Sequence, residues 1–329
     1  MPTANQTLIT GATGCIGGAI VRRLHGEGRS VLALIRPQSD ATKIEALGVP
    51  VARADVRDQE AVDRAIRGVS NVIHVAGLFR VGGLPDHEYR SVQVEGTRVL
   101  VEASKRHGVG RFVHCSTIGV HGSVKNIPTN ENSPFNPNDI YQQTKLEGEQ
   151  LVQSAIREGF PGVVIRPAGV YGPSDLRHLK LLRLLKQGRF VMFGNGSAFW
   201  HPVFLDDLVD GFLSALDSQV SLGRTYIMAG PRWVPLKMWI EEAARTVDAQ
   251  PPKLKFPYWT LLGASVACEA LCKPLGIEPP LHRRRATFFV NNRAFSIDKA
   301  CNELGYSPKV DIAEGLARTA AWYRQEGLL

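Results

Sequence analysis

The first half of the chain alternates short apolar runs with stretches of helical pattern, and this alternation restricts the fold more than any other feature. The apolar runs cover residues 7–10, 30–35, 71–75, 111–115 and 162–166, and helical patterns cover residues 19–25, 59–66 and 92–107. Strands joined by helices make right-handed crossovers and lie parallel in one sheet, with helices on both faces. The sequence therefore predicts an α/β protein with a doubly wound parallel sheet, whose ligands bind at the carboxyl ends of the strands.

A glycine-rich loop, Thr10-Gly-Ala-Thr-Gly-Cys-Ile-Gly-Gly18, follows the first strand and opens the first helix. Gly11 allows the tight turn, Gly14 lets the backbone approach a pyrophosphate, and Gly17 lets the helix pack close to the sheet. The free N–H groups and partial positive charge of the helix N-terminus attract phosphates. The loop therefore predicts a Rossmann domain that binds a dinucleotide.

The end of the second strand indicates which dinucleotide binds. An acidic residue there would accept hydrogen bonds from the adenosine ribose, but this chain has Ile35-Arg36. A guanidinium can pair with a 2′-phosphate and stack on adenine. Arg36 therefore favours NADP, with NAD as the alternative, and Asp55-Val56 after the third strand is expected to flank the adenine.

Tyr141 and Lys145 stand four residues apart in a segment predicted to be helical, so they share one face. A free tyrosine has a pKa of about 10, and a neighbouring ammonium lowers it toward the range useful for proton transfer. Lys145 can also hold the nicotinamide ribose, and Thr117 would present its hydroxyl to the substrate oxygen. This set predicts hydride transfer between nicotinamide and a substrate carbon, with Tyr141 transferring the proton.

The pattern changes after residue 172, where helices separated by Gly and Pro breaks dominate. We interpret residues 1–172 as the dinucleotide-binding domain and residues 173–329 as a smaller, mostly helical substrate-binding domain. Segments near 203–207 and 224–228 are expected to return to the main sheet. Residues 258–272 are apolar nearly all round apart from Glu269. They are too few for the ~20 residues of a spanning helix, which leaves a packed helix, a lid over an apolar substrate, or a helix that dips into a membrane.

Several polar residues are expected to be structural. His74, His114 and His121 end or follow strands, where lone histidines are usually neutral and packed or hydrogen-bonded, and no pair has metal-ligand spacing. Asp206-Asp207 is expected to begin a helix and to cap its free N–H groups. We therefore predict no bound metal.

Composition and charge are those of an ordinary soluble protein, with 44% hydrophobic residues, 21% charged residues and a net charge of +8. The basic residues are spread along the chain apart from His282-Arg-Arg-Arg285, so the charge favours phosphates, acidic substrates or an anionic membrane over nucleic acid. Five scattered cysteines form no disulfide framework, and residues 1–7 show no secretory pattern. We expect a cytoplasmic protein with a small-molecule substrate, and peripheral membrane contact stays open.

Six segments spread over the chain carry a further pattern. They are Thr10-Gly-Ala-Thr-Gly-Cys-Ile-Gly17, Val92-Gln-Val-Glu-Gly-Thr97, Ser116-Thr-Ile-Gly-Val-His-Gly122, Tyr141-Gln-Gln-Thr-Lys145, Arg166-Pro-Ala-Gly-Val-Tyr-Gly-Pro173 and Leu304-Gly-Tyr-Ser-Pro308. Together they resemble the extended short-chain dehydrogenase/reductase family, in its epimerase/dehydratase group. The resemblance implies a nicotinamide cofactor, a homodimer, and Thr117 rather than Ser116 at the hydroxyl position.

Two positions depart from the family pattern. Gln93 stands where the family usually has Asn near the nicotinamide. Trp200, beside Phe199, stands where members acting on nucleotide sugars often carry an Arg that meets the diphosphate. The segments 258–272 and 276–281, together with Arg36, resemble instead the branch that contains 3β-hydroxysteroid dehydrogenases and dihydroflavonol reductases.

The leading interpretation is an NADP(H)-preferring oxidoreductase of a secondary alcohol or ketone in a largely apolar, steroid- or flavonoid-like molecule. The alternative is a nucleotide-sugar 4-epimerase or dehydratase that holds NAD tightly. A third interpretation, a cofactor-binding regulator without turnover, is disfavoured by the complete set of Thr117, Tyr141 and Lys145.

The candidate site combines these predictions. The cofactor-binding residues are Gly11, Thr13, Gly14, Cys15, Ile16, Gly17, Arg36, Asp55, Val56, Ala76, Gly77, Tyr141, Lys145, Pro167 and Val170. The substrate-binding residues are Phe79, Thr117, Trp200 and His201.

Overall fold

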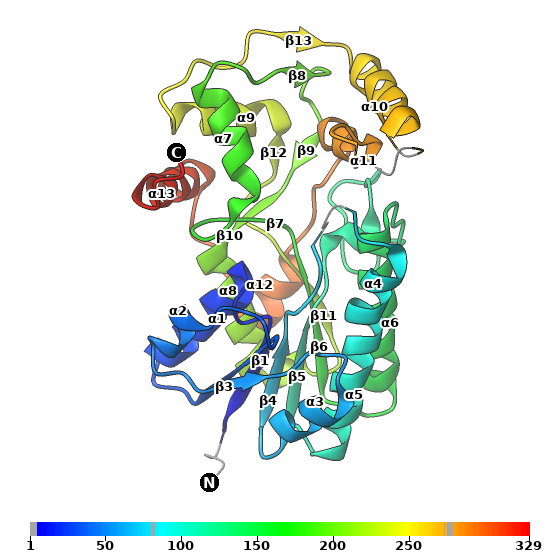
Figure 1. Ribbon diagram of the computed structural model, residues 1–329, viewed down its shortest axis with the longest axis vertical. Helices are drawn as coiled ribbons and strands as arrows, with labels where there is room; N and C mark the ends of the chain where they lie inside the picture. The colour runs from blue at the N-terminus through cyan, green and yellow to red at the C-terminus, as the bar shows by residue number, and fades with distance from the viewer. Residues whose placement is uncertain (1–4, 80–82, 273, 275–278) are drawn as a thin grey trace.

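One parallel sheet forms the centre of the molecule (Figure 1), and the computed structural model describes residues 5–79, 83–272, 274 and 279–329. The strand order is β11-β6-β5-β4-β1-β2-β3. The strands are β1 (Thr7–Thr10), β2 (Val31–Ile35), β3 (Val51–Arg53), β4 (Asn71–His74), β5 (Arg111–Cys115), β6 (Gly162–Pro167) and β11 (Thr225–Met228), and all pair in parallel. The predicted doubly wound fold is confirmed, and the five strands expected from the apolar runs are all present.

Helices cover both faces of the sheet (Figure 1). One face carries α3 (Gln59–Ile66), α5 (Gly96–Arg106) and α6 (Ile140–Arg157), and the other carries α1 (Cys15–Gly26), α2 (Thr42–Glu45), α8 (Leu205–Asp217) and α12 (Asp298–Leu304). Successive side chains of a strand point to opposite faces. In β6, Val163 and Ile165 therefore join one core and Val164 the other. Burial on both faces explains why these strands are continuous apolar runs in the sequence.

Of the two segments expected to return to the main sheet, one does so. β11 pairs with the outer edge of β6, as predicted. The prediction for residues 203–207 was wrong, because β10 (Pro202–Phe204) pairs instead with β7 (Gly169–Tyr171), which continues the chain beyond β6. Both edges of β6 already have partners, β5 and β11, so β10 finds a free edge only beyond the end of β6.

The rest of the chain builds a second, smaller core above the sheet (Figure 1). It includes α7 (Leu179–Lys186), α9 (Leu236–Arg245) and α13 (Ile312–Gln325), which pack around the buried Trp239. Two short pairs of strands flank them: β9 (Phe199–Trp200) with β12 (Val234–Pro235), and β8 (Met192–Phe193) with β13 (Lys255–Phe256). α10 (Tyr258–Cys272) lies next to β13, and α11 (Arg283–Ala286) packs against α10. Within the described ranges no helix is long and apolar enough to cross a membrane.

The predicted helix over 92–107 is divided in the structure. α4 (Asp86–Arg90) leads into a π-helical turn, η1 (Ser91–Glu95), and α5 follows. A Cβ on Gly148 of α6 would lie only 2.6 Å from the carbonyl oxygen of Gln93, so α6 packs directly against this turn. Short 3₁₀ turns complete the chain: η2 (Ile118–His121), η3 (Leu176–His178), η4 (Gln219–Ser221) and η6 (Thr287–Phe289).

Asp206 and Asp207 lie in the first turn of α8, but the prediction that they cap this helix was wrong. The carboxylate of Asp207 accepts hydrogen bonds from the backbone N–H groups of Lys309 and Val310, at 3.0 and 3.1 Å, just before α13. Asp206 pairs with Arg318 of α13 at 2.5 Å. The two carboxylates therefore hold α13 against α8.

Candidate active site

The glycine loop forms a cradle at the carboxyl end of β1. Gly11 has a φ of +68°, and a Cβ on it would lie 2.9 Å from the backbone nitrogen of Ala76. A Cβ on Gly17 would lie 2.3 Å from the carbonyl oxygen of Gly11, so α1 can approach the loop only without a side chain there. Gly14 precedes α1, and neither a capping side chain nor an acidic residue occupies its first turn. The free N–H groups of that turn are suited to a phosphate.

The other predicted cofactor residues lie along the same edge of the sheet. Ala76 and Gly77 follow β4, Val56 follows β3, Pro167 ends β6, Val170 lies in β7, and Thr13, Cys15 and Ile16 lie where the loop enters α1. The edge therefore runs from the glycine loop across β4 to the end of β6, where a dinucleotide lies in folds of this class.

A buried hydrogen-bond chain joins the cradle to the neighbouring helix. Thr97 donates its hydroxyl proton to Gln93 O at 2.7 Å, so its oxygen accepts from His74 Nε2 at 3.0 Å. The other ring nitrogen, Nδ1, then accepts from the hydroxyl of Thr10 at 2.8 Å, and the Thr10 oxygen accepts from Ala76 N at 3.0 Å. Burial lowers the pKa of His74 to about 3, so the ring stays neutral and this pattern is fixed.

Arg36 lies at the exposed end of β2, beside the loop that follows β3. Its guanidinium makes no hydrogen bond or ion pair within the described part of the chain. Asp55 is held by Arg57 through two contacts of 2.9 and 2.8 Å, and these bonds lower the pKa of its carboxyl. Because Asp55 is bound by Arg57, the charge of Arg36 is available to a ligand.

The two hydroxyls after β5 have different partners. Ser116 is buried and donates to the Glu149 carboxylate at 2.5 Å. Thr117 is partly exposed and accepts a hydrogen bond from Gly119 N at 3.0 Å, and its proton has no acceptor within the described residues. The Thr117 hydroxyl can therefore still donate a hydrogen bond to a ligand. Ser116 lies within the protein, so the geometry favours Thr117 at the reacting centre.

The helix α6 carries Tyr141 and Lys145 toward the same edge. Its N-cap, Asp139, accepts from Gln142 N at 2.9 Å and fixes where the helix begins. Lys145 is buried, and its Nζ donates to the Cys115 carbonyl oxygen. Burial lowers the pKa of Lys145, and the nearby Glu149 carboxylate opposes that shift.

Gln93 reaches α6 from the π-helical turn. Its Nε2 donates to the hydroxyl of Thr144 and to the carbonyl oxygen of Tyr141, the latter at 3.4 Å. Its Oε1 is buried 3.6 Å from where a Cβ on Gly77 would lie, and it has no hydrogen-bond partner within the described residues. This acceptor and the space at Gly77 fit a polar cofactor group or a water beside it. The cradle and this atom together show that the residues fit a dinucleotide.

A second cation near Tyr141 was not anticipated from the sequence. The ring of Phe79 lies edge-on to that of Tyr141, with centroids 5.0 Å apart. The guanidinium of Arg177 lies 4.9 Å from the Phe79 centroid, and it bonds to Asp175 at 2.7 Å and to Val170 O at 3.1 Å. The pKa of Arg177 is lowered by burial and raised by Asp175, with Tyr141 contributing to a net upward shift. The signal in the sequence was a basic residue soon after the Tyr171-Gly-Pro173 motif.

Trp200 and His201, which were predicted to bind substrate, have packing roles. The indole of Trp200 lies under Gly169, where a Cβ would come within 2.4 Å of it, and Arg293 lies 5.4 Å from its ring centroid. His201 is buried: its Nε2 donates to Gly230 O at 2.9 Å and its Nδ1 accepts from Phe295 N at 3.3 Å. Burial lowers the pKa of His201 to about 4. With both ring nitrogens engaged, we do not retain His201 as a substrate contact.

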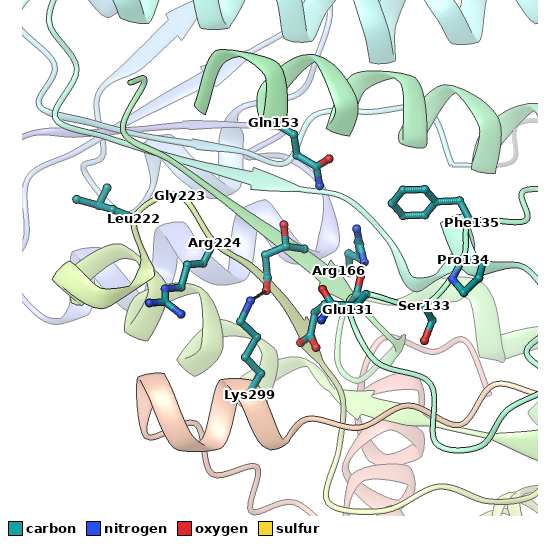
Figure 2. A pocket seen from close by; sticks show the side chains of 12 residues that line it. Glu131, Ser133, Pro134, Phe135, Gln153, Arg166, Leu222, Gly223, Arg224 and Lys299 are labelled. Atoms are coloured by element: carbon teal, nitrogen blue, oxygen red, sulfur yellow. Dashed lines mark hydrogen bonds between the residues drawn. The ribbon is translucent and has the colours of Figure 1, made fainter. Parts of the chain in front are cut away.

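A cavity lies among the loop of residues 131–135, α6, the start of β11 and α12 (Figure 2). Arg166, which lines it, pairs with the buried Glu149 at 2.5 Å, and Gln153 also donates to Glu149 at 2.7 Å. The cavity has a volume of about 690 Å³, and its lining includes Gln153, Arg166 and Lys299. Lys299 donates to Thr225 O at 2.9 Å. Neither Thr117 nor Tyr141 lines this cavity, so it is distinct from the candidate active site.

Comparison with known proteins identifies the family. The model of the NAD-dependent epimerase/dehydratase family matches residues 7–229. Sterol demethylase protein B of Methylococcus capsulatus is 30% identical, with 98% of this chain and 99% of that protein covered. The 2-alkyl-3-oxoalkanoate reductase of Stenotrophomonas maltophilia is 28% identical (96% and 98% covered), and the dTDP-glucose 4,6-dehydratase of Streptomyces antibioticus is 29% identical (96% and 92%).

A Rossmann sheet, a glycine cradle and the grouped hydroxyl, tyrosine and lysine define an enzyme that works with a nicotinamide dinucleotide. The chain belongs to the NAD-dependent epimerase/dehydratase family.

Proposed function

We propose that this protein is an NADP(H)-preferring oxidoreductase that interconverts a ketone and a secondary alcohol in a largely apolar substrate. The observation that carries the proposal is the ring of Phe79, which lies against Tyr141 and is 45% exposed. An exposed aromatic ring beside the proton donor would lose water favourably against an apolar ring system. It would serve a sugar, whose hydroxyls need polar partners, less well.

Each residue of the set has a distinct role in this reaction. The bound nicotinamide supplies or accepts the hydride. Tyr141 gives a proton to the carbonyl oxygen in reduction and takes it back in oxidation. The Thr117 hydroxyl donates to the same oxygen and stabilises the charge that develops there. Lys145 favours the phenolate of Tyr141 by its positive charge and lies beside Gly77, where it would hold the nicotinamide ribose.

Arg36 supports the preference for NADP. Its guanidinium, at the end of β2, has no hydrogen-bond or ion-pair partner among the residues that the structure describes, and Asp55, the nearby acid, is held by Arg57. The 2′-phosphate would pair with Arg36.

The organisation of the molecule follows the same proposal. Residues 1–172, with the returning β11, would bind the dinucleotide, and residues 173–329 would provide most of the substrate pocket. We also propose a cytoplasmic homodimer. Mass measurement in solution checks the dimer.

A substrate screen tests the proposed function. We expect NADPH oxidation with steroid-like or other apolar ketones, and little binding of UDP or dTDP in calorimetric titration. Thr117→Val, which keeps the shape of the side chain but removes the hydroxyl, should abolish most of the turnover. Micromolar binding of UDP or dTDP, with no turnover of any apolar ketone, would contradict the proposal.

One observation favours the alternative, a nucleotide-sugar epimerase or dehydratase. Although Trp200 replaces the expected arginine, the guanidinium of Arg293 lies against its ring and brings positive charge to the same place. The relative from Streptomyces is a dTDP-glucose dehydratase. Conversion of a UDP- or dTDP-sugar by the pure protein, with nicotinamide retained through purification, would establish this alternative.

A further inference from the structure

The helix α10 lies at the surface, but most of its buried residues are polar and its exposed side is apolar. Its buried side consists of Leu261, Ser265 and Glu269, at spacings of four residues. The carboxylate of Glu269 accepts from Arg283 N at 2.8 Å and from Arg283 Nε at 3.0 Å, and α11 packs against α10. Two of the three buried residues are therefore polar. A surface helix normally has the opposite arrangement, with its apolar stripe toward the core.

The outward side of α10 is apolar and lacks charge. Trp259 is 71% exposed, Val266 47% and Leu271 72%. The residues between them on this side are Gly and Ala. Two further apolar residues are exposed just before the helix: Phe256 in β13, and Leu254, which precedes that strand. In Figure 1, β13 and α10 lie side by side at one end of the molecule, the end opposite the N-terminus.

Positive charge borders this apolar surface. Lys253 and Lys255 are exposed and alternate with Leu254 and Phe256. Between residues 251 and 272 the only acid is Glu269, and it is already paired. Tryptophan with lysine or arginine around an apolar face is typical of helices that lie in the interface of an anionic membrane.

A second copy of the chain fits this surface less well. Two copies that met through α10 would bring Lys253 and Lys255 of one near the same residues of the other, and within residues 251–272 the one acid, Glu269, is already paired. Like charges brought together at an interface disfavour the pairing.

We propose that the outward face of α10, with Leu254 and Phe256, docks onto an anionic lipid surface. Trp259, Val266 and Leu271 enter the boundary between headgroups and acyl chains, and Lys253 and Lys255 contact the lipid phosphates. The protein lies on the membrane and does not span it. The proposal does not depend on the proposed function, because it concerns residues outside the catalytic set.

Flotation of the full chain with phosphatidylcholine–phosphatidylglycerol vesicles tests the proposal. We expect the protein to float with these vesicles, and to bind pure phosphatidylcholine vesicles and high-salt samples more weakly. Trp259→Glu combined with Leu271→Glu should weaken binding ~10-fold or more. Val220→Glu, at a residue that is 50% exposed on η4, is the matched control and should bind like the wild type.

Two further measurements keep the result interpretable. Lys253→Glu with Lys255→Glu should weaken binding to the anionic vesicles while leaving the thermal unfolding temperature unchanged. If the Trp259 and Leu271 pair of changes lowers that temperature, Leu271→Ser alone provides the same comparison with a milder change. Wild-type protein that does not float would overturn the proposal. The proposal would also be overturned if changes in α10 lowered the mass of the protein in solution and left vesicle binding the same. That result would mean that a second copy of the chain covers this face.

Discussion

The ring of Phe79 meets the ring of Tyr141 edge-on, with centroids 5.0 Å apart and ring planes at 81°. Phe79 follows β4 and Tyr141 begins α6, so the contact joins two segments that are far apart in the sequence. Arg177, from the turn after β7, lies on the same Phe79 ring. Tyr141, the proposed proton donor, is thus bordered by one apolar surface and one cation.

Removing the apolar surface should weaken substrate binding more than it slows chemistry. For Phe79→Ala we expect the KM for an apolar ketone to rise ~10-fold or more, the scale for losing the burial of an aromatic side chain. The kcat should change less, because Thr117, Tyr141 and Lys145 remain. Steady-state kinetics with saturating NADPH measures both. An unchanged KM, with Val220→Ala as the control for an exposed site, would show that the substrate does not touch Phe79.

The second cation should tune the proton donor. A positive charge near Tyr141 favours the phenolate and lowers the pKa of the tyrosine. Arg177→Met removes that charge, so we expect the rising limb of the pH profile for alcohol oxidation to move to higher pH. Arg177→Lys should restore the profile in part. A profile that does not move in Arg177→Met would limit Arg177 to holding Phe79 and the turn around Asp175.

Cofactor preference should depend on a single exposed residue. Arg36→Asp removes the partner of the 2′-phosphate and adds repulsion, so the variant should bind NADH better than NADPH. Fluorescence titration of both cofactors against wild type and variant gives the ratio of Kd values. Equal or tighter NADH binding by the wild type would reject the assignment.

Buried neutral histidines should make the fold sensitive to mild acid. Burial lowers the pKa of His74 to about 3 and that of His201 to about 4, whereas an unfolded histidine titrates near 6.5. Below pH ~6.5 the unfolded chain takes up protons that the folded chain does not, so stability is present above that pH and is lost as the pH falls toward the folded pKa values. We expect a loss on the order of 2 kcal/mol per histidine between pH 7 and pH 5.

Urea unfolding at the two pH values measures this loss. His201→Gln, whose amide can still donate to Gly230 O, should be less sensitive to acid than the wild type. A wild-type free energy of unfolding that is equal at both pH values would mean that the histidines protonate without unfolding.

The sheet could be predicted because its signals are local. A buried strand can be recognised from the apolar residues of its own segment. The glycines of the cradle are required by contacts within the same loop, such as that of Gly17 with Gly11. The strand or loop that a segment contacts cannot be predicted from local signals. The pattern of residues 203–207 indicates a strand but not that β7 is its neighbour. Asp207 looks like a helix cap, yet it binds a loop some hundred residues later in the chain.

The same limit applies to the site. Tyr141, Lys145 and Thr117 could be proposed from spacing and resemblance, because each stands in a short motif. Arg177 could not, since its place beside Tyr141 depends on how the turn after β7 folds back over Phe79. His201 was predicted to bind substrate, but its ring nitrogens form hydrogen bonds with the backbone of Gly230 and Phe295.

The most direct test follows the hydride and the proton donor together. The protein is incubated with an apolar ketone and NADPH that carries deuterium at nicotinamide C4, and the product is examined by mass spectrometry. We expect an alcohol that carries the deuterium on the former carbonyl carbon. Tyr141→Phe should lose ~10²-fold or more in rate while binding NADPH normally. Tyr226→Phe removes a hydroxyl on β11 that bonds to Glu303 of α12, and this control should retain its rate. Failure of every apolar ketone to acquire deuterium, or an unimpaired Tyr141→Phe variant, would contradict the account.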